Sequence, residues 1–289
     1  MSPAAMLRRM TGRITIGIDA GGSGCRVALR LPSGQVTSAK GGPANAFADP
    51  AKAADEIRAC LNRAVAKAGL GADMLSGAAI CAGVAGCRLP AIAEDMTARL
   101  ASPVRVVDDS VTALHGTFPD RDGCLVNLGT GSFFLRKTGE EYRHIGGWGF
   151  DLGDEASGAW AGRLAAGACL RVLDGRLPED PLADAVLAQL SPHPLIALQG
   201  ASPAAFAALA PLVLKNAASP LGASILAACL DEVAHGLAAL GWSRGVLWAL
   251  TGGFGTALIP HLPPALRAGL TEPQGTALDG ALALAEAMP

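Results

Sequence analysis

The sequence predicts an α/β protein of two domains, in which short buried strands alternate with helices. Its 289 residues give each of two domains enough chain for a hydrophobic core of its own. Apolar runs of strand length alternate with stretches of helical periodicity. Three glycine-rich turns, at residues 17–23, 129–132 and 251–255, each follow a short apolar run. Because glycine lets backbone N–H groups approach phosphate oxygens, these turns together indicate a nucleotide held between the domains.

The first half of the chain is predicted to begin with three consecutive strands. They span residues 14–18, 26–31 and 35–39 and are joined by the first glycine turn and a Pro-Ser-Gly turn. A helix follows over 51–68, where apolar positions recur at helical spacing before Gly69. Strands at 78–82 and 104–107 then flank a helix over 89–100, and a last helix starts near Ser110.

The second half of the chain repeats this beginning. Strands are predicted at 123–128, 132–137 and 141–145, followed by mostly helical sequence over 154–240 and a strand at 246–250. The repetition indicates a structural duplication. Turn residues at 119–123 mark the connection, so we expect domains at 13–117 and 118–289. The final helix, over 275–288, is placed so that it can cross back onto the first domain.

Composition narrows the classes of partner. Hydrophobic residues make up 51% of the chain and charged residues 17%, which favours a compact protein over a disordered one. A formal charge of -2 without clustered Lys and Arg argues against nucleic-acid binding. Apolar stretches such as 223–230 are far shorter than the ~20 residues that span a bilayer. We therefore expect neither a nucleic acid nor a membrane as partner.

The seven cysteines form no CxxC pair, and their number is odd. This pattern is typical of buried free thiols in a reducing cytoplasm. Cys81 and Cys87 lie nearest to each other along the chain. They either pack beside a turn or serve as ligands of a metal or cluster, and both interpretations stay open.

Two acidic groups stand at strand ends. Asp19 opens the first glycine turn, either as a turn residue bonded to its own backbone or as a ligand of Mg²⁺ beside the phosphates. Asp108 and Asp109 follow a buried strand at a helix start, where either can be the N-cap. If the bound nucleotide donates a phosphoryl group, one carboxylate is needed near the acceptor hydroxyl to take its proton. No histidine spacing or nucleophile motif indicates covalent catalysis, so direct in-line transfer is expected.

A glycine-rich loop in the second half holds further candidates. Trp148 lies between Gly147 and Gly149, and it either belongs to the core or contacts a sugar. Asp154 and Glu155 start a helix, where they either favour its dipole or bind a ligand.

Residues 146–158, Gly-Gly-Trp-Gly-Phe-Asp-Leu-Gly-Asp-Glu-Ala-Ser-Gly, resemble the signature of the BadF-type amino-sugar kinases. That branch contains N-acetylglucosamine kinase and bacterial glucosamine kinase, within the sugar kinase, Hsp70 and actin superfamily. Residues 41–45 and 273–282 resemble the bacterial glucosamine kinases as well, whereas Ala20 and Ala156 stand where many relatives have glycine. The resemblance implies two ribonuclease H-like (actin-like ATPase) domains with a ligand cleft between them.

The resemblance also implies an activity: ATP- and Mg²⁺-dependent phosphorylation of the 6-hydroxyl of N-acetylglucosamine or glucosamine, in a cytoplasmic homodimer. It places the metal at Asp19 and the catalytic base at Asp109, with Asp108 as the helix cap or a neighbour that tunes the base. The implied nucleotide-binding residues are Gly21, Gly22, Ser23, Gly129, Thr130, Gly131, Gly252 and Gly253. The implied sugar-binding residues are Asn45, Asp109, Gly147, Trp148, Gly149 and Asp154.

Two other functions are weighed against this one. The same branch contains ATPases that activate acyl-CoA reductases or dehydratases through an iron–sulfur cluster, which requires cysteines that converge at a dimer interface. A sugar sensor that kept the binding site and lost the chemistry is expected to lack the acid at position 109 or to carry a DNA-binding extension. The spacing of the cysteines and the presence of Asp109 favour the kinase.

Overall fold

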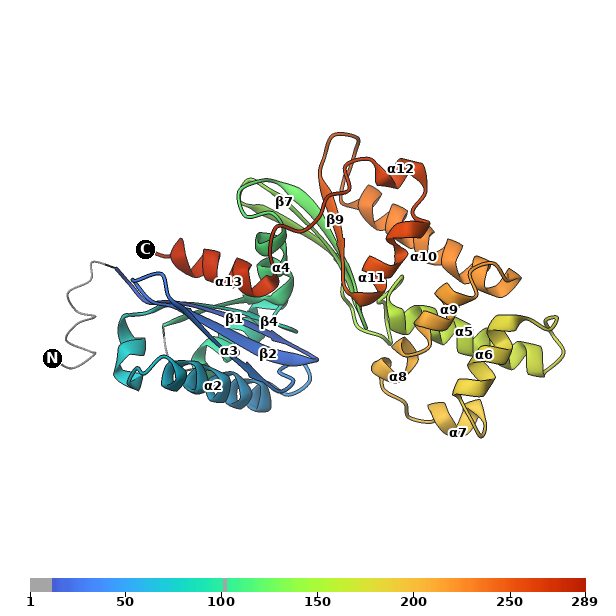
Figure 1. Ribbon diagram of the computed structural model, residues 1–289, viewed down its shortest axis with the longest axis horizontal. Coiled ribbons are helices and arrows are strands. Elements are labelled where there is room, and N and C mark those ends of the chain that lie inside the picture. Colours follow the sequence, from blue (N-terminus) through green and yellow to red (C-terminus); the bar gives the residue numbers. More distant parts are fainter. Residues whose placement is uncertain (1–11, 101–102) are drawn as a thin grey trace. The chain divides into compact units, whose positions relative to one another are not determined.

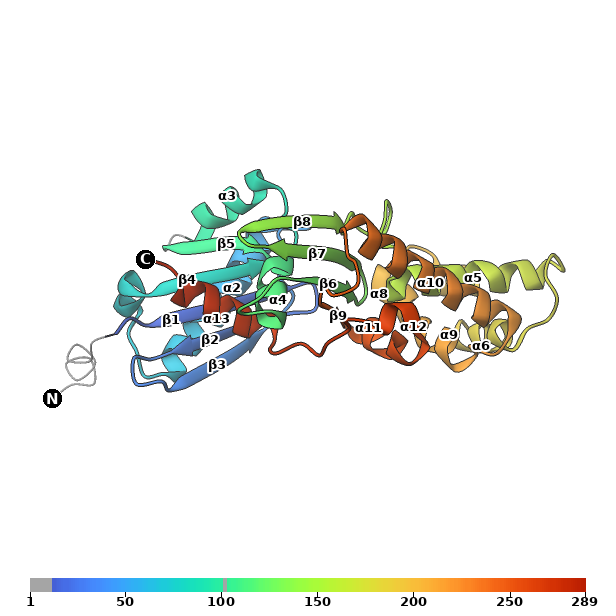
Figure 2. The ribbon, with the colours of Figure 1, turned by 90° about the horizontal axis from the view of Figure 1, so that it is seen from above.

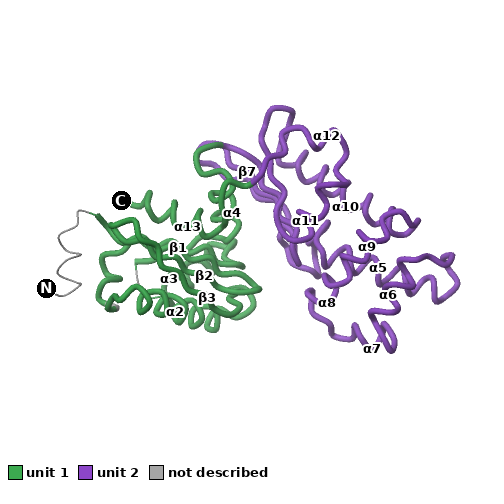
Figure 3. Tube along the Cα trace, viewed as in Figure 1, with its two compact units in different colours: residues 1–121, 273–289 green, residues 122–272 purple. Residues whose placement is uncertain are grey.

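The chain folds into two compact units, each built on its own β-sheet. The computed structural model describes residues 12–100 and 103–289 (Figure 1). Unit 1 contains the chain up to residue 121 together with residues 273–289, and unit 2 contains residues 122–272 (Figure 3). The chain therefore forms most of unit 1, continues through all of unit 2, and returns to unit 1 with its last helix.

The sheet of unit 1 has five strands in the order β3-β2-β1-β4-β5. The strands are β1 Thr15–Gly21, β2 Gly24–Arg30, β3 Val36–Gly41, β4 Ala79–Val84 and β5 Val104–Asp108. β2 pairs antiparallel with both β1 and β3, whereas β4 is parallel to both of its neighbours, β1 and β5. The carboxyl ends of β1, β4 and β5 therefore lie along one edge of the sheet.

Helices cover both faces of this sheet. Helices α2 (Pro50–Lys67) and α3 (Pro90–Leu100) lie on one face, and α13 (Ala277–Glu286) lies on the other beside α4 (Asp109–Thr117) (Figures 1 and 2). A 3-10 helix, Ala72–Gly77, precedes β4. The start of α2 is set by Asp49, whose Oδ1 accepts a hydrogen bond from the Lys52 amide at 3.0 Å. Its buried side chains recur at helical spacing and join the core beneath the sheet.

Unit 2 has a four-stranded sheet in the order β8-β7-β6-β9. The strands are β6 Gly123–Leu128, β7 Ser132–Thr138, β8 Glu141–Gly146 and β9 Trp248–Thr251. β9 is parallel to β6, and the other pairings are antiparallel. The remaining elements are α5 Gly158–Leu173, α6 Pro181–Gln189, α7 Pro194–Leu198, α8 Pro203–Ala207, α9 Ala210–Lys215, α10 Pro220–Ala239, α11 Gly253–Leu258, the 3-10 helix Ile259–His261 and α12 Pro264–Arg267.

Helix α10 is the only helix among residues 12–100 and 103–289 that is long and apolar enough to cross a membrane. Its buried side chains, which include Ile225, Cys229 and Val233, belong to the hydrophobic core of unit 2. An apolar composition is also typical of a core helix in a globular domain, because other parts of the domain cover such a helix on several sides.

The structure extends or moves several of the predicted boundaries. β1 continues to Gly21 and β2 begins at Gly24, because these two residues pair across the sheet and leave only a two-residue turn. The predicted domain boundary at 117/118 differs from the observed one at 121/122. The buried Phe118, whose amide donates to the Leu114 carbonyl, still belongs to the end of α4. Residues 273–289, included in the predicted second domain, belong to unit 1, where α13 packs on β1 and α4, as expected for a final helix that crosses back onto the first domain.

Glycines bring α13 into close contact with α4. A Cβ atom on Gly280 would lie 2.0 Å from the Thr112 carbonyl oxygen, and one on Gly116 would lie 1.9 Å from that of Thr276. The start of α13 is a capping box, in which the Thr276 hydroxyl accepts from the Asp279 amide and the Asp279 carboxylate accepts from the Thr276 amide. The C-terminal helix therefore supports the helix that begins at Asp109.

We expect Gly280→Ala to lower the free energy of unfolding by ~2–4 kcal/mol, because the added methyl group requires the two helices to move apart. Gly167→Ala in α5 is the matched control, since a Cβ atom there meets nothing within 4 Å. That change should be neutral or stabilise the protein by ~0.5–1 kcal/mol through helix propensity. Urea unfolding of the wild type and both variants tests this prediction. A Gly280→Ala variant that unfolds at the same urea concentration as the wild type would show that the α13–α4 contact is not tight.

Candidate active site

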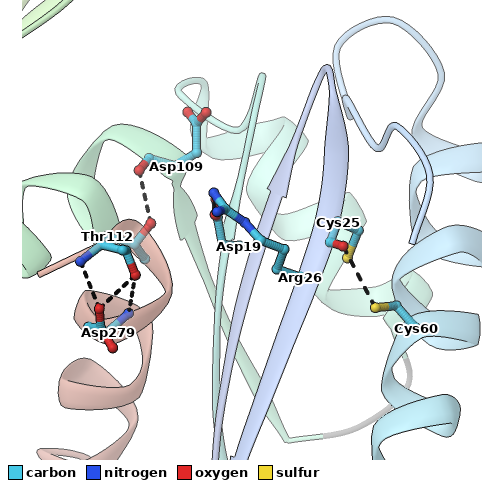
Figure 4. Close-up of polar contacts among 8 residues, drawn as sticks. Asp19, Cys25, Arg26, Cys60, Asp109, Thr112 and Asp279 are labelled. Carbon is cyan, nitrogen blue, oxygen red and sulfur yellow. Dashed lines mark hydrogen bonds and ion pairs between the residues drawn. The ribbon is translucent and has the colours of Figure 1, made fainter. Parts of the chain in front are cut away.

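Asp19 lies near the carboxyl end of β1, directly opposite Arg26 on β2. Its carboxylate accepts a hydrogen bond from Arg26 Nη2 at 2.6 Å (Figure 4). The two side chains differ in exposure, since 52% of the Arg26 side chain and 11% of the Asp19 side chain are accessible to solvent. The aspartate is therefore held in the sheet, while the guanidinium group extends toward solvent.

The turn that follows Asp19 is open to a ligand. A Cβ atom on Gly22 would meet no protein atom within 4 Å, and the residue lies outside the left-handed region of backbone space. Neither packing nor backbone conformation requires a glycine here. A glycine that the fold does not require is expected where another molecule approaches the backbone closely. The turn therefore fits the predicted phosphate-binding role of Gly21, Gly22 and Ser23.

Asp108 and Asp109 have different roles in the local structure. Asp108 is the N-cap of α4, where its carboxylate accepts from the Ser110 amide at 3.1 Å and from the Ser110 hydroxyl. The interpretation of Asp108 as the helix cap is confirmed. Asp109 is the first residue of the helix. Its backbone carbonyl accepts from Thr112 Oγ1 at 2.9 Å (Figure 4), and its carboxyl group accepts from its own amide and from that of Ser110.

The electrostatic setting of Asp109 favours its protonated form. Burial, followed by the charges of Asp108 and Asp19, raises the pKa of Asp109 to about 8. Asp108 is thus both the helix cap and a neighbour that tunes Asp109. A cation bound between these carboxylates would favour the ionised form of Asp109, because it would offset the two neighbouring charges.

Asn45 lies in a loop that extends the sheet edge of unit 1. Its Oδ1 accepts from the amides of Phe47 at 3.0 Å and Ala48 at 3.2 Å, and its backbone forms a parallel bridge with Ala85, just after β4. The side-chain oxygen is therefore used to shape the loop. The Nδ2 amide is the part of this side chain that can donate to a sugar hydroxyl.

The two glycine turns of unit 2 lie together at the carboxyl ends of β6 and β9. Gly252 has φ +83°, and a Cβ atom on it would lie 2.4 Å from the Leu128 carbonyl oxygen, next to Gly129. This close approach requires glycine. A Cβ atom on Gly253, in contrast, would meet nothing within 4 Å. The turn that contains Thr130 and Gly131 and the turn at 252–253 thus form one glycine-lined surface in unit 2.

The loop over 146–154 is joined to this surface by Asp154. The carboxyl group of Asp154 is buried and accepts hydrogen bonds from the backbone amides of Ser132 and Gly149, while its Oδ2 lies 2.7 Å from where a Cβ atom of Gly131 would be. Burial raises the pKa of Asp154, and the two amides oppose this shift. The side chain therefore connects the loop to the glycine turn.

Two backbone positions in this segment are strained. Asp154 and Ala156 have φ of +58° and +60°, which costs an L-residue roughly 1–2 kcal/mol each. This conformation explains why glycine suits position 156 in the relatives whose signature the loop resembles. Trp148 is 61% exposed, so the interpretation of this residue as part of the core is wrong. Trp148 therefore lies on the surface of the loop, between Gly147 and Gly149.

The donor set around Asp19 fits Mg²⁺ better than a metal held by protein ligands alone. The described residues contain no group of three or more His, Cys, Asp or Glu side chains that could hold a metal ion. Mg²⁺ is usually held by one or two carboxylates with water and substrate phosphates. A single buried carboxylate beside an open glycine turn, with Asp108 and Asp109 nearby, meets that description.

The cysteines are all buried and free. Burial raises the pKa of Cys81 to about 11 and that of Cys87 to about 12, so both remain neutral thiols, which are poor metal ligands. Packing is therefore the better interpretation of this pair.

Sequence reasoning missed two side chains at the unit 1 edge, Arg26 and Phe47. A signal for Arg26 was present, because it is a charged residue between apolar Cys25 and Val27, just after the glycine turn. Phe47 had no comparable signal, since its exposure depends on how the loop after Asn45 folds.

Comparisons with known proteins show the family of the chain. A model of the BadF/BadG/BcrA/BcrD ATPase family matches residues 16–260. The chain is 26% identical to glucosamine kinase GspK of Vibrio cholerae over 93% of this chain and 95% of that protein. It is 33% identical to the N-acetylmuramic acid/N-acetylglucosamine kinase of Clostridium acetobutylicum over 57% of this chain and 56% of that protein. A solved structure from Chromobacterium violaceum, provisionally assigned as an N-acetylglucosamine kinase, superposes with a TM-score of 0.86 at 36% identity, covering 94% of this chain and 99% of that one.

The raised pKa of Asp109 predicts a pH-dependent cost to stability. Between its ordinary pKa of 3.8 and about 8, the folded protein retains a proton that the unfolded chain releases, so the free energy of unfolding falls as pH rises through this range. Asp109→Asn removes this dependence. We expect its Tm to match that of the wild type near pH 4 and to exceed it by several degrees above about pH 8.

Thermal unfolding across this pH range is the measurement. Asp120→Asn, at an exposed position before β6, is the control, because it removes a carboxyl group that the fold does not bury. A difference in Tm between Asp109→Asn and wild type that does not change with pH would contradict the prediction.

Proposed function

Because the chain belongs to the BadF/BadG/BcrA/BcrD ATPase family, we propose that it is an ATP-dependent amino-sugar kinase. In this proposal it transfers the γ-phosphoryl group of ATP directly to the 6-hydroxyl of N-acetylglucosamine or glucosamine. The names of its relatives support the substrate class, since both curated proteins act on amino sugars of this kind. The loop at 146–158 is the most specific part of this resemblance.

One observation carries the chemistry: Asp109, a half-buried residue whose carboxyl group has a raised pKa, lies on the same sheet edge as Asp19 and its open glycine turn. The charge of Asp19 reaches Asp109 and raises its pKa, so the two side chains are near each other. Phosphoryl transfer depends on positioning and charge neutralisation, with one base for the acceptor hydroxyl. Unit 1 supplies both a candidate base and a candidate phosphate site.

In the proposed mechanism Asp109 accepts the proton of the 6-hydroxyl as the phosphoryl group arrives. Mg²⁺ held by Asp19 through water would neutralise charge on the β- and γ-phosphates when bound. Asp108 holds the first turn of α4 and so fixes the position of Asp109. Thr112 restrains the same turn through the Asp109 carbonyl.

The proposed binding residues come from both units. Gly21, Gly22 and Ser23 of unit 1 and the glycine surface of unit 2, comprising Gly129, Thr130, Gly131, Gly252 and Gly253, are proposed to bind the nucleotide. The amide of Asn45, the exposed Trp148 with Gly147 and Gly149, and Asp154 are proposed to bind the sugar. Asp154 uses two of its about four acceptor positions on backbone amides, which leaves positions for a sugar hydroxyl.

The proposed setting is the cytoplasm, which the seven buried free thiols support. A homodimer is proposed from the family resemblance. The alternative of an acyl-CoA dehydratase activator is disfavoured, because a cluster shared between subunits requires accessible thiols and each cysteine is buried. The alternative of a sensor without activity is disfavoured by the presence of Asp109, the acid that such a sensor is expected to lack.

A coupled ADP assay over glucosamine, N-acetylglucosamine, N-acetylmuramic acid and glucose tests the proposed function. We expect an amino sugar to be the preferred substrate, and Asp109→Asn to lower its rate of phosphorylation by ~10²–10⁴-fold without loss of ATP binding. Asp108→Asn should reduce the rate far less, because an asparagine still caps the helix. If Asp108→Asn were the more damaging change, the base would be Asp108.

Asp154 gives a second test, at the sugar loop. Asp154→Ala removes the acceptor of two backbone amides and a proposed sugar contact, so we expect sugar binding to weaken by ~1–3 kcal/mol and Tm to fall. Asp151→Ala, at an exposed position of the same loop, is the control and should change neither quantity. Calorimetric titration with the preferred sugar measures the effect. Sugar affinity equal to that of the wild type would assign Asp154 a purely structural role.

A further inference from the structure

We infer that Phe47 is a sugar-contacting residue, whose ring packs against the C–H face of the sugar beside Asn45. This inference rests on the proposed function and adds a residue to its sugar site. Phe47 is 73% exposed, and it follows Asn45 by two positions in the loop between β3 and α2. Single exposed apolar side chains are common on proteins, so exposure alone does not support a role. The role of Phe47 is supported instead by the hydrogen bonds that hold its loop and by the residues that lie near it.

The loop that carries Phe47 is held at several points. The Phe47 amide donates to Asn45 Oδ1 at 3.0 Å, and the Ala46 amide donates to the Ala85 carbonyl at 2.9 Å. The Ala44 amide donates to the Gly21 carbonyl, also at 2.9 Å, which ties the loop to the phosphate turn. A ring on a backbone fixed in this way is preorganised, so binding a ligand costs little further ordering.

Gly86 allows this loop to lie close to the end of β4. It has φ +85°, and a Cβ atom on it would lie 2.6 Å from the Phe47 amide nitrogen and 2.8 Å from Asn45 Oδ1. The next residue, Cys87, is close enough to Asp108 and Asp109 for both charges to raise the pKa of its thiol. Phe47 and Asn45 therefore belong to the same neighbourhood of unit 1 as the proposed base.

The chemistry of a hexopyranose matches this pair of side chains. Its hydroxyl groups project around the rim of the ring, while its axial C–H bonds form an apolar face. Phenylalanine has no polar atom and offers only an apolar surface, whereas the adjacent Asn45 amide can donate to a hydroxyl. Small-molecule sites combine apolar or aromatic walls with a few placed polar groups in this way.

Steady-state kinetics of Phe47→Ala, Phe47→Trp and Val36→Ala test the inference. Val36 is also exposed, at 51%, but it begins β3 opposite Arg30, at the other end of the sheet from Gly41 and the Asn45 loop. We expect Phe47→Ala to raise the KM of every sugar that the wild type uses by about tenfold, with kcat and the KM for ATP within about threefold. Phe47→Trp should keep the wild-type KM, and Val36→Ala should change nothing.

Each other outcome overturns a defined part of the inference. An unchanged sugar KM in Phe47→Ala shows that the ring does not contact the sugar. A rise confined to N-acetylated sugars shows that Phe47 contacts the acetyl group rather than the sugar ring. An equal rise in Val36→Ala, or a fall in Tm in Phe47→Ala, assigns the effect to stability. Failure of the proposed function is distinct from all of these, because the wild-type protein itself would then phosphorylate no amino sugar.

Discussion

The parallel pairing of β1, β4 and β5 is the constraint on which the site in unit 1 depends. In a parallel sheet all carboxyl ends meet at one edge, so the residues that follow each strand are brought together whatever their separation in sequence. Asp19 pairs with Gly83 on β4, which in turn pairs with Val107 on β5, one residue before Asp108. The acidic groups, the glycine turn and the Asn45 loop share this edge for that reason.

Three aspartates lie along this edge of the sheet, where their negative charges repel one another unless other groups offset them. The charges of Asp19 and Asp108 both act on Asp109, and the three carboxyl groups have different partners. Asp108 accepts from the first turn of α4, Asp19 pairs with Arg26, and Asp109 retains its proton up to about pH 8. Carboxyl groups whose surroundings differ in this way can take different roles. One can bind a cation beside a polyphosphate, while another gives up its proton when the cation binds and then serves as the base.

The C-terminal helix shows how distant sequence supports this arrangement. α13 packs on α4 through glycines that permit contact between the helix backbones, and Arg30 pairs with Glu286 near its end. α4 begins at the proposed base, so its position depends on residues that come last in the chain. The α13–α4 contact depends on close packing of the two helix backbones, and backbone atoms in close contact cannot adjust as a flexible side chain can.

The sequence by itself determined the elements whose signals are local. The strand over 123–128 was predicted with the bounds that the structure shows, and the helix predicted over 51–68 is shifted by one residue, because apolar periodicity and turn residues act over a few positions. The same local signals identified the glycine turns and the acids at strand ends, and the loop at 146–158 identified the family. Only the tertiary structure decided that Arg26 pairs with Asp19, that Trp148 and Phe47 are exposed, and that the last helix belongs to unit 1. Strand register and helix packing set these features, and both depend on contacts between residues far apart in the chain, which local pattern does not encode.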